Sequence, residues 1–212
     1  MDTPIDPPLS EEEARVLGSL IEKDLTTPEY YPLSANALML AANQKSNRDP
    51  VVEYDEQVVL AAVAALRQRG WPAELSGPGM RVAKYRHRLG EKLNLGRGEL
   101  GLLAVLLLRG PQTLAELRER TSRMHSFEDT ESVVFTLRRL PDGYVTELVR
   151  QPGWKETRWA HLLCGPVEPG FAGAPRESRS EPREAIGERV ARLESELAQL
   201  RAEFDELKRQ LT

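Results

Sequence analysis

The residues best suited to chemistry gather in one basic segment between positions 81 and 92. Its relevant side chains are Arg81, Lys84, Tyr85, Arg86 and Arg88, followed by Lys92. Cationic groups bind phosphate, and an aromatic ring among them can stack on a base. We therefore predict that the first five of these residues bind nucleic acid. The alternative is that the segment is a solvated face, or that it neutralises the acidic run Glu11–Glu13.

Segments that look like enzyme motifs lack the context that their chemistry needs. Residues Gly96–Gly101 match G-x-G-x-x-G, but a dinucleotide site requires a buried strand before the glycines and an acidic residue about 20 positions later. We interpret this segment as a linker and a helix start. His161 and Cys164 lack a paired metal-ligand spacing, and no nucleophile motif or phosphate loop occurs. The sequence predicts no catalytic residue, no metal ion and no cofactor.

Charge is distributed unevenly along the 212 residues, although the net charge is only −4. Residues 1–64 hold twelve acids and four bases, whereas residues 65–98 hold eight bases and two acids. This asymmetry indicates a local basic surface rather than a basic protein.

Cysteine content and apolar runs bear on the cellular compartment. The single cysteine, Cys164, excludes an intramolecular disulfide and fits a reducing compartment. A signal peptide has a positively charged region followed by an apolar core, and the first residues of this sequence show neither. The longest apolar runs, Val58–Leu66 and Leu102–Leu108, are too short to span a bilayer. We expect a soluble cytoplasmic protein with no membrane partner.

Three predicted helices and a hairpin position the basic segment. Ser10 begins a capping box at the start of a helix with an apolar face, and further helices are expected at Ser34–Asn43 and Asp55–Arg69. Residues Ala73–Ser76 and Met80–Arg86 flank a Gly-Pro-Gly turn and are typical of a hairpin. Three helices followed by a two-stranded wing is the winged-helix order, and the basic segment lies in the wing.

The same order of elements recurs in the second half of the chain. The apolar positions of residues 99–107 overlay those of residues 13–21, Thr113 opens another capping box, and Phe127–Leu140 supplies a third helix. A second hairpin is expected from Tyr144–Arg150 and Thr157–Leu163. The repeat predicts a mainly α fold with small β-hairpin wings, built as two tandem winged-helix units.

The helix at Asp55–Gly70 takes the place of a DNA-reading helix but has unsuitable residues. A reading helix offers polar, usually basic side chains from its first turns. Here those turns hold two acids and a glutamine, followed by nine Ala, Val or Leu residues. The corresponding helix of the second repeat also begins with acids. We therefore predict that Val58, Ala61 and Ala65 make a protein contact, either with the sister repeat or with a second subunit.

The C-terminal tail repeats apolar residues every three and four positions. The seam is Ile186, Val190, Leu193, Leu197, Leu200, Phe204, Leu207 and Leu211. This heptad pattern is typical of a coiled coil, and its flanking charges match in a parallel pair. We predict a homodimer, with an antiparallel pair or a helix docked on its own chain as alternatives. The predicted organisation is repeat 1 over residues 1–92, repeat 2 over 93–165, a flexible linker over 166–183 and a coiled-coil helix over 184–212.

Several longer segments are specific enough to compare with known families. They are residues 13–23, 26–34, 43–51, 81–85, 106–113 and 116–118. At these positions the chain resembles the YceH-like family of uncharacterised bacterial proteins, over about residues 10–165. The resemblance implies tandem winged-helix domains, and it implies no activity, cofactor or catalytic residue. Where Ala-Cys is expected from the family, this chain has Ala41 and Ala42, which argues against an essential thiol there.

These patterns together predict a dimeric, non-enzymatic protein that mainly contacts an unidentified protein partner. The first wing adds weak, sequence-tolerant nucleic-acid contact. The alternative is a regulator that reads a specific DNA site, which would prefer that site strongly over random DNA. An enzyme would need a pocket with convergent polar groups. The polar turn Gln44–Pro50 fits a plain loop or a contact to phosphate or a partner.

Overall fold

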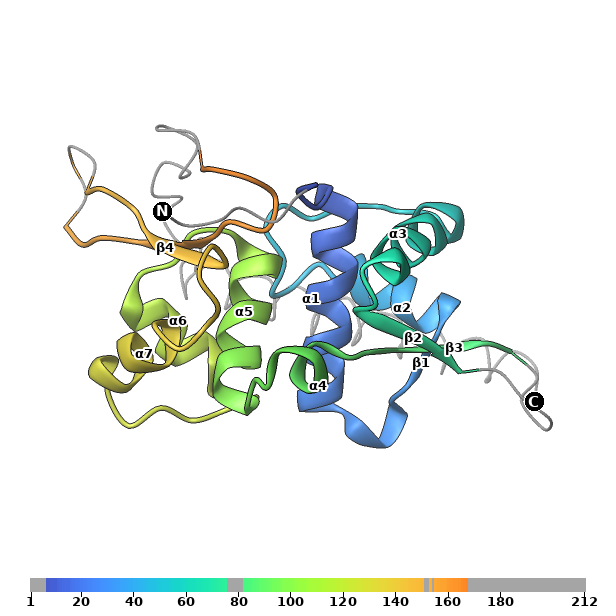
Figure 1. Ribbon diagram of the computed structural model, residues 1–212, viewed down its shortest axis with the longest axis horizontal. Coiled ribbons are helices and arrows are strands. Elements are labelled where there is room, and N and C mark those ends of the chain that lie inside the picture. The colour runs from blue at the N-terminus through green and yellow to red at the C-terminus, as the bar shows by residue number, and fades with distance from the viewer. Residues whose placement is uncertain (1–6, 76–81, 151–152, 154, 168–212) are drawn as a thin grey trace, which may run out of the picture. The chain divides into compact units, whose positions relative to one another are not determined.

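Each half of the described chain contains three longer helices and a small antiparallel sheet (Figure 1). The computed structural model describes residues 7–75, 82–150, 153 and 155–167, which lie in one compact unit, Met1–Ala172. The elements are α1 Glu11–Thr26, η1 Pro28–Tyr30, β1 Leu33–Ser34, α2 Ala35–Ala42, α3 Glu56–Gln68, β2 Pro72–Leu75, β3 Lys84–His87, α4 Leu89–Leu93, α5 Arg97–Arg109, α6 Leu114–Thr121, α7 Thr130–Leu137, β4 Val145–Glu147 and β5 Trp159–His161. The mainly helical class is confirmed. The predicted coiled-coil seam lies outside the described residues.

The helices begin at residues that cap them. Ser10, Ser34 and Asp55 each accept a hydrogen bond from the backbone N–H three residues later, at the predicted helix starts. The return bond from the Glu13 side chain that would complete the predicted capping box at Ser10 is not found among the described residues. Thr113 and Asp129 form complete capping boxes. A cap of this kind stabilises its helix by about 1 kcal/mol. The cap at Asp129 also explains why α7 begins at Thr130 rather than at the predicted residue 127.

The first sheet contains a strand that the hydrophobic pattern does not predict. Strand β1 pairs antiparallel with β3, and β3 pairs with β2, so the order is β1-β3-β2. A two-residue strand has too little sequence to show alternation, so the hydrophobic pattern cannot reveal β1. Strand β3 begins at Lys84 and ends at His87, so residues 82 and 83 of the predicted strand Met80–Arg86 are not part of it. The second hairpin, β4 with β5, is confirmed in shorter form.

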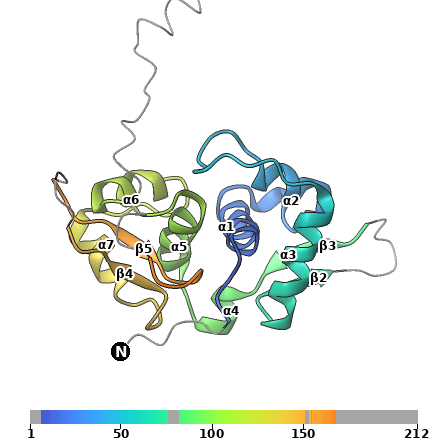
Figure 2. The ribbon, with the colours of Figure 1, turned by 90° about the horizontal axis from the view of Figure 1, so that it is seen from above.

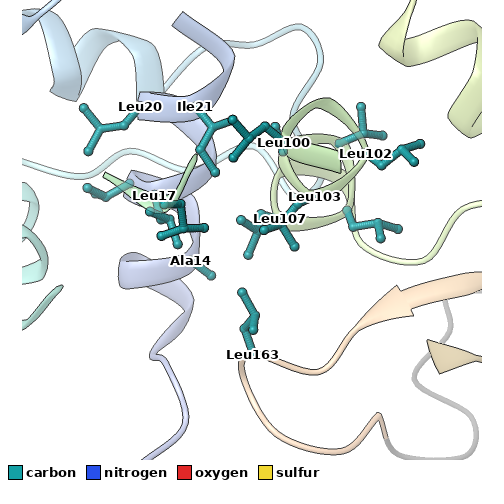
Figure 3. Close-up of a cluster of buried hydrophobic side chains, with 14 of the residues drawn as sticks. Ala14, Leu17, Leu20, Ile21, Leu100, Leu102, Leu103, Leu107 and Leu163 are labelled. Atoms are coloured by element: carbon teal, nitrogen blue, oxygen red, sulfur yellow. The ribbon is translucent and has the colours of Figure 1, made fainter. Parts of the chain in front are cut away.

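Helices α1 and α5 pack side by side and join the two halves in one core (Figure 2). Leu17, Leu20 and Ile21 of α1 belong to the same core cluster as Leu103 and Leu107 of α5, and all five are almost fully buried (Figure 3). Every residue of α5 from position 98 to 108 is buried. Apart from Glu99, which pairs with Arg139, these residues are uncharged, as expected of a helix that is buried on all sides. No helix within the described part of the chain has the length and apolar content to cross a membrane.

Burial of His161 makes stability depend on pH. Burial lowers the pKa of His161 to about 4, and the Nδ1 atom is buried without a hydrogen-bond partner among the described residues. An unfolded histidine has a pKa of about 6.5, so the unfolded chain binds the proton first as pH falls. We expect the free energy of unfolding to fall by about 1–3 kcal/mol between pH 7 and pH 4.5, with the upper value discounted for partial solvent access.

The measurement is urea unfolding of the wild type and of His161→Gln at both pH values. The variant stays neutral, so the difference between the two proteins isolates this histidine from the carboxylates. We expect the stability difference to shrink as the pH falls from 7 to 4.5. A difference that is the same at both pH values would contradict the assignment.

Candidate functional site

Strand β3 divides the predicted basic segment between two faces. Lys84 and Arg86 are partly exposed, whereas Tyr85 and His87 are buried. This follows from the period of two in a β-strand, where successive side chains point to opposite faces. Lys84 lies between Ser34 of β1 and Leu75 of β2, so the strand that carries these residues is the central one. Arg81 lies outside the described residues.

Tyr85 is not placed to stack on a base. Its side chain is part of the hydrophobic core and the residue is only 7% exposed. A ring in this position contributes packing rather than a binding surface. The sequence contains the signal for this correction, because residues 84, 86 and 88 share a period of two and residue 85 falls on the other face.

Arg86 and Arg88 share one carboxylate to which no sequence motif points. Arg86 Nη2 lies 3.0 Å from Glu91 Oε1, and Arg88 Nε lies 3.0 Å from Glu91 Oε2. The hydrogen bond from Arg88, with the charges of both arginines, lowers the pKa of Glu91. All three side chains are well exposed, so these ion pairs are weak. A phosphate group can therefore compete with Glu91 for both guanidinium groups.

A cleft of about 570 Å³ opens beside these arginines. His87 lies in its wall, with Nε2 3.0 Å from Asp24 Oδ2 at the end of α1. The His87 backbone N–H donates to Tyr31 Oη over 2.6 Å. Burial raises the pKa of Tyr31, so its hydroxyl stays protonated. Sequence reasoning misses Asp24 and Tyr31 because they lie 63 and 56 residues before His87, and no local pattern connects them.

The cleft presents donors to a negatively charged group. Its lining includes the guanidinium groups of Arg86 and Arg88, whose N–H groups are donors. Arg86 Nε is buried without a hydrogen-bond partner among the described residues. Asp24 fixes the orientation of the His87 imidazole through Nε2. Within that same part of the chain, no three His, Cys, Asp or Glu side chains are grouped to hold a metal ion. The chemistry that this arrangement offers is anion binding.

Helix α3 buries one face and leaves a neutral stripe outside. Val59, Ala62, Val63 and Leu66 are buried in the core that α3 shares with α1. Of the predicted contact residues, Ala61 is exposed, and Val58 and Ala65 are partly exposed. Much of the apolar content of this helix is therefore explained by the core of the chain itself. The outward stripe is small and uncharged at its centre.

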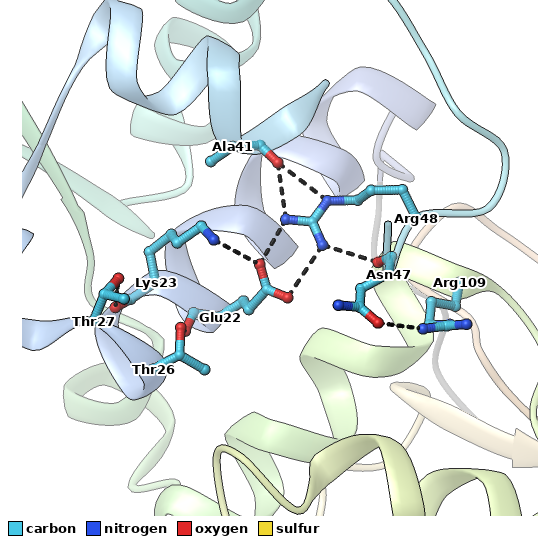
Figure 4. A network of polar contacts seen from close by, with 8 residues as sticks. All are labelled: Glu22, Lys23, Thr26, Thr27, Ala41, Asn47, Arg48 and Arg109. Atoms are coloured by element: carbon cyan, nitrogen blue, oxygen red, sulfur yellow. Dashed lines mark hydrogen bonds and ion pairs between the residues drawn. The ribbon is translucent and has the colours of Figure 1, made fainter. Parts of the chain in front are cut away.

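The turn Gln44–Pro50 contributes Arg48 to the most buried ion pair among the described residues (Figure 4). The Arg48 side chain is 0% exposed, and it binds both carboxylate oxygens of Glu22 at 2.6 and 3.1 Å. It also donates to the carbonyls of Ala41 and Asn47. Asn47 adopts a left-handed conformation, which asparagine tolerates, and its Oδ1 accepts from Arg109 of α5 at 2.8 Å. The turn thus connects α1, α2 and α5.

The glycine segment Gly96–Gly101 is a helix start, as predicted. Gly96 is the N-cap of α5, and the helix α4 rather than a strand precedes it. Cys164 lies near the start of α1, where burial raises its thiol pKa to about 11. A protonated thiol is a poor nucleophile.

Comparison with known proteins gives consistent matches over most of the chain. The family described as "Protein of unknown function, DUF480" matches residues 9–154. A "UPF0502 protein" of Solibacter usitatus is 49% identical over 198 residues, covering 93% of this chain and 95% of the relative. Those of Pelobacter propionicus and Citrifermentans bemidjiense are 51% and 52% identical, over 95% and 88% of this chain and 94% and 86% of their own lengths. These names state no ligand or reaction.

Proposed function

The chain belongs to the DUF480 family of bacterial UPF0502 proteins, and from this premise we propose a non-enzymatic winged-helix protein whose first wing makes weak, sequence-tolerant contacts with nucleic-acid phosphates. The order helix, strand, two helices and two strands in the first half supports the winged-helix part. In the second half an isolated bridge from Gln112 to Trp159 takes the place that β1 has in the first. The YceH-like naming remains a prediction from the resemblance.

One observation carries the phosphate proposal. Lys84, Arg86 and Arg88 are cations on the described part of the wing and are partly exposed, while the first turn of α3 presents Glu56 and Gln57. Cations on the wing attract the phosphate backbone without reading bases. An acidic first turn on α3 disfavours base reading in the major groove, apart from contacts to cytosine. Because Glu91 competes for two of the three cations, the expected contact is weak.

The experiment measures duplex DNA binding by full-length protein as a function of salt. Lys84→Gln with Arg88→Gln should flatten the log–log slope by about 1.8, or 0.9 for each phosphate that is no longer neutralised. Glu91→Gln should act in the opposite direction and tighten binding, because it frees both arginines. The charge-matched control is Arg138→Gln with Lys155→Gln, two exposed cations of the second half.

The same measurement separates the proposal from a sequence-specific regulator. A regulator should prefer its site by at least about 10³ over random DNA, and Ala61→Glu on the outward stripe of α3 should abolish that preference. Under our proposal Ala61→Glu leaves binding nearly unchanged. A wing variant that keeps the slope of the control variant would contradict the proposal.

We also propose that the outward stripe of α3 contacts protein and that the heptad tail makes the protein a homodimer. The stripe around Ala61 offers a helix partner close approach and offers a phosphate no positive charge. The heptad seam, with its matched flanking charges, supports a parallel pair. Sedimentation of the full-length protein at the mass of one chain would exclude the dimer.

A further inference from the structure

A second polar cavity, of about 190 Å³, lies where the ends of α1, α5 and α6 meet the turn Gln44–Pro50. We call it the junction cavity. Four cationic side chains line it: Lys23, Arg109, Arg120 and Arg123. None of the residues predicted to bind nucleic acid lines this cavity. Figure 4 shows Lys23 and Arg109 together with the polar residues between them.

The acids near the junction cavity are already bound by other cations. Glu22 is held by both nitrogen termini of Arg48, so its contact with Lys23 at 3.5 Å adds little. Glu116 pairs with Arg120 at 3.1 Å, but it also pairs with Arg158 at 2.9 Å. These two carboxylates are shared with other cations, and Asp49 also acts on Arg109, so the four cations of the lining still outnumber the carboxylates that can compensate them.

Arg109 and Arg123 add to this excess of positive charge. The partner of Arg109 is the neutral amide oxygen of Asn47. Arg123 is exposed and makes no ion pair within the described part of the chain. Burial, followed by the charge of Arg120, lowers the pKa of Arg109, and nearby carboxylates, Asp49 first, oppose this to a smaller extent. Arg109 and Arg120 line the same cavity, so their positive charges repel each other.

Helix dipoles alone do not account for these cations. Three helices end here, and the C-terminus of each carries about half a negative charge. Together these partial charges balance less than half of the four positive charges. Their last carbonyls also have other donors. Thr26 and Thr27 donate to the final turn of α1, Gln112 to that of α5, and Thr121 to that of α6. A negative ligand would balance the charge that the carboxylates and helix ends leave.

We propose that the junction cavity binds a phosphoryl group, held by Lys23, Arg109, Arg120 and Arg123. Its volume is below the roughly 300 Å³ of pockets for drug-sized ligands, which suits inorganic phosphate or the phosphate end of a small molecule. Guanidinium groups match the geometry of phosphate oxygens through paired hydrogen bonds. Lys23 belongs to the first half of the chain and the three arginines to the second, so the ligand connects both halves.

The test is calorimetric titration of full-length protein with inorganic phosphate and, separately, with adenosine monophosphate. We expect one site per chain with a Kd below about 1 mM, because Glu91 already pairs with both arginines of the wing cleft and makes any phosphate contact there weaker. If the two probes bind with equal affinity, the ligand of the cavity is free phosphate. If adenosine monophosphate binds more tightly, the ligand is a phosphorylated small molecule. Arg123→Gln should weaken binding about tenfold, since a hydrogen bond to a charged group contributes about that factor or more. The double variant Lys23→Gln with Arg123→Gln should bind phosphate more weakly than Arg123→Gln alone.

Lys45→Gln is the matched control, because it removes one charge from the same turn without lining the junction cavity. The wing variant Lys84→Gln with Arg88→Gln should leave phosphate binding unchanged, so the two proposals fail or succeed separately. Binding that is absent at about ten times the expected Kd, or equally weak in Arg123→Gln and Lys45→Gln, would overturn the proposal. Unfolding curves verify that each variant is folded.

Discussion

Replacing Arg48 by methionine should lower the free energy of unfolding by about 3–5 kcal/mol. The methionine side chain retains the apolar stem but leaves the Glu22 carboxylate, which is only 13% exposed, without its main partner. Burial alone would raise the pKa of Glu22, and the hydrogen bonds and charge of Arg48 outweigh that effect and lower it. The backbone carbonyl of Ala41 also loses two donors. Urea unfolding of the full-length protein measures the loss.

The double variant Arg48→Met with Glu22→Met shows whether the loss of stability comes from the unpaired Glu22 charge or from the loss of side-chain packing at position 48. Replacing both members of a buried pair by apolar side chains is often neutral or stabilising. We therefore expect the double variant to be more stable than Arg48→Met alone, although it carries one more substitution. The prediction fails if the second substitution adds to the loss, or if Arg48→Met costs less than about 1 kcal/mol.

Local signals in the sequence predict most of the fold. Ser10, Ser34, Asp55 and Thr113 are capping residues followed by apolar positions at helical spacing, and each begins a helix where expected. Caps and periodicity act within a few residues, so one sequence is enough to detect them. Strand β1 escapes such signals because its two residues are extended only through pairing with β3. Such pairing is a tertiary effect without a local pattern.

The candidate site is predictable only in part for the same reason. The cations Lys84, Arg86 and Arg88 are close together in sequence, and their charge is visible as a run. The contacts that modify them come from residues that are distant or unremarkable. Asp24 reaches His87 across 63 residues, and Glu91 acts on two arginines at once. The junction cavity leaves no pattern, because its cations are spread from position 23 to position 123.

The close approach of α1 and α5 depends on Gly18, and this leads to the second large effect. A Cβ atom at position 18 would lie 2.9 Å from Leu108 Cγ and 3.0 Å from Leu107 Cβ, both on α5. These neighbours are themselves buried, so they have little room to move. We expect Gly18→Val to lower the free energy of unfolding by about 1–3 kcal/mol or more through overpacking. Gly18→Ala should cost less, since alanine gains about 1 kcal/mol of helix propensity over glycine.

Gly101 is the matched control, because it is also a buried glycine within a helix of the same core. Its added Cβ would meet Met124 Cβ at 3.5 Å, which is an ordinary van der Waals contact. Gly101→Ala should therefore be neutral or stabilising by up to about 1 kcal/mol. The two alanine substitutions are chemically identical, so opposite signs in urea unfolding would assign the difference to the α1–α5 contact. Equal effects at both positions would mean that the helices separate to accommodate the methyl group, and that Gly18 does not set their distance.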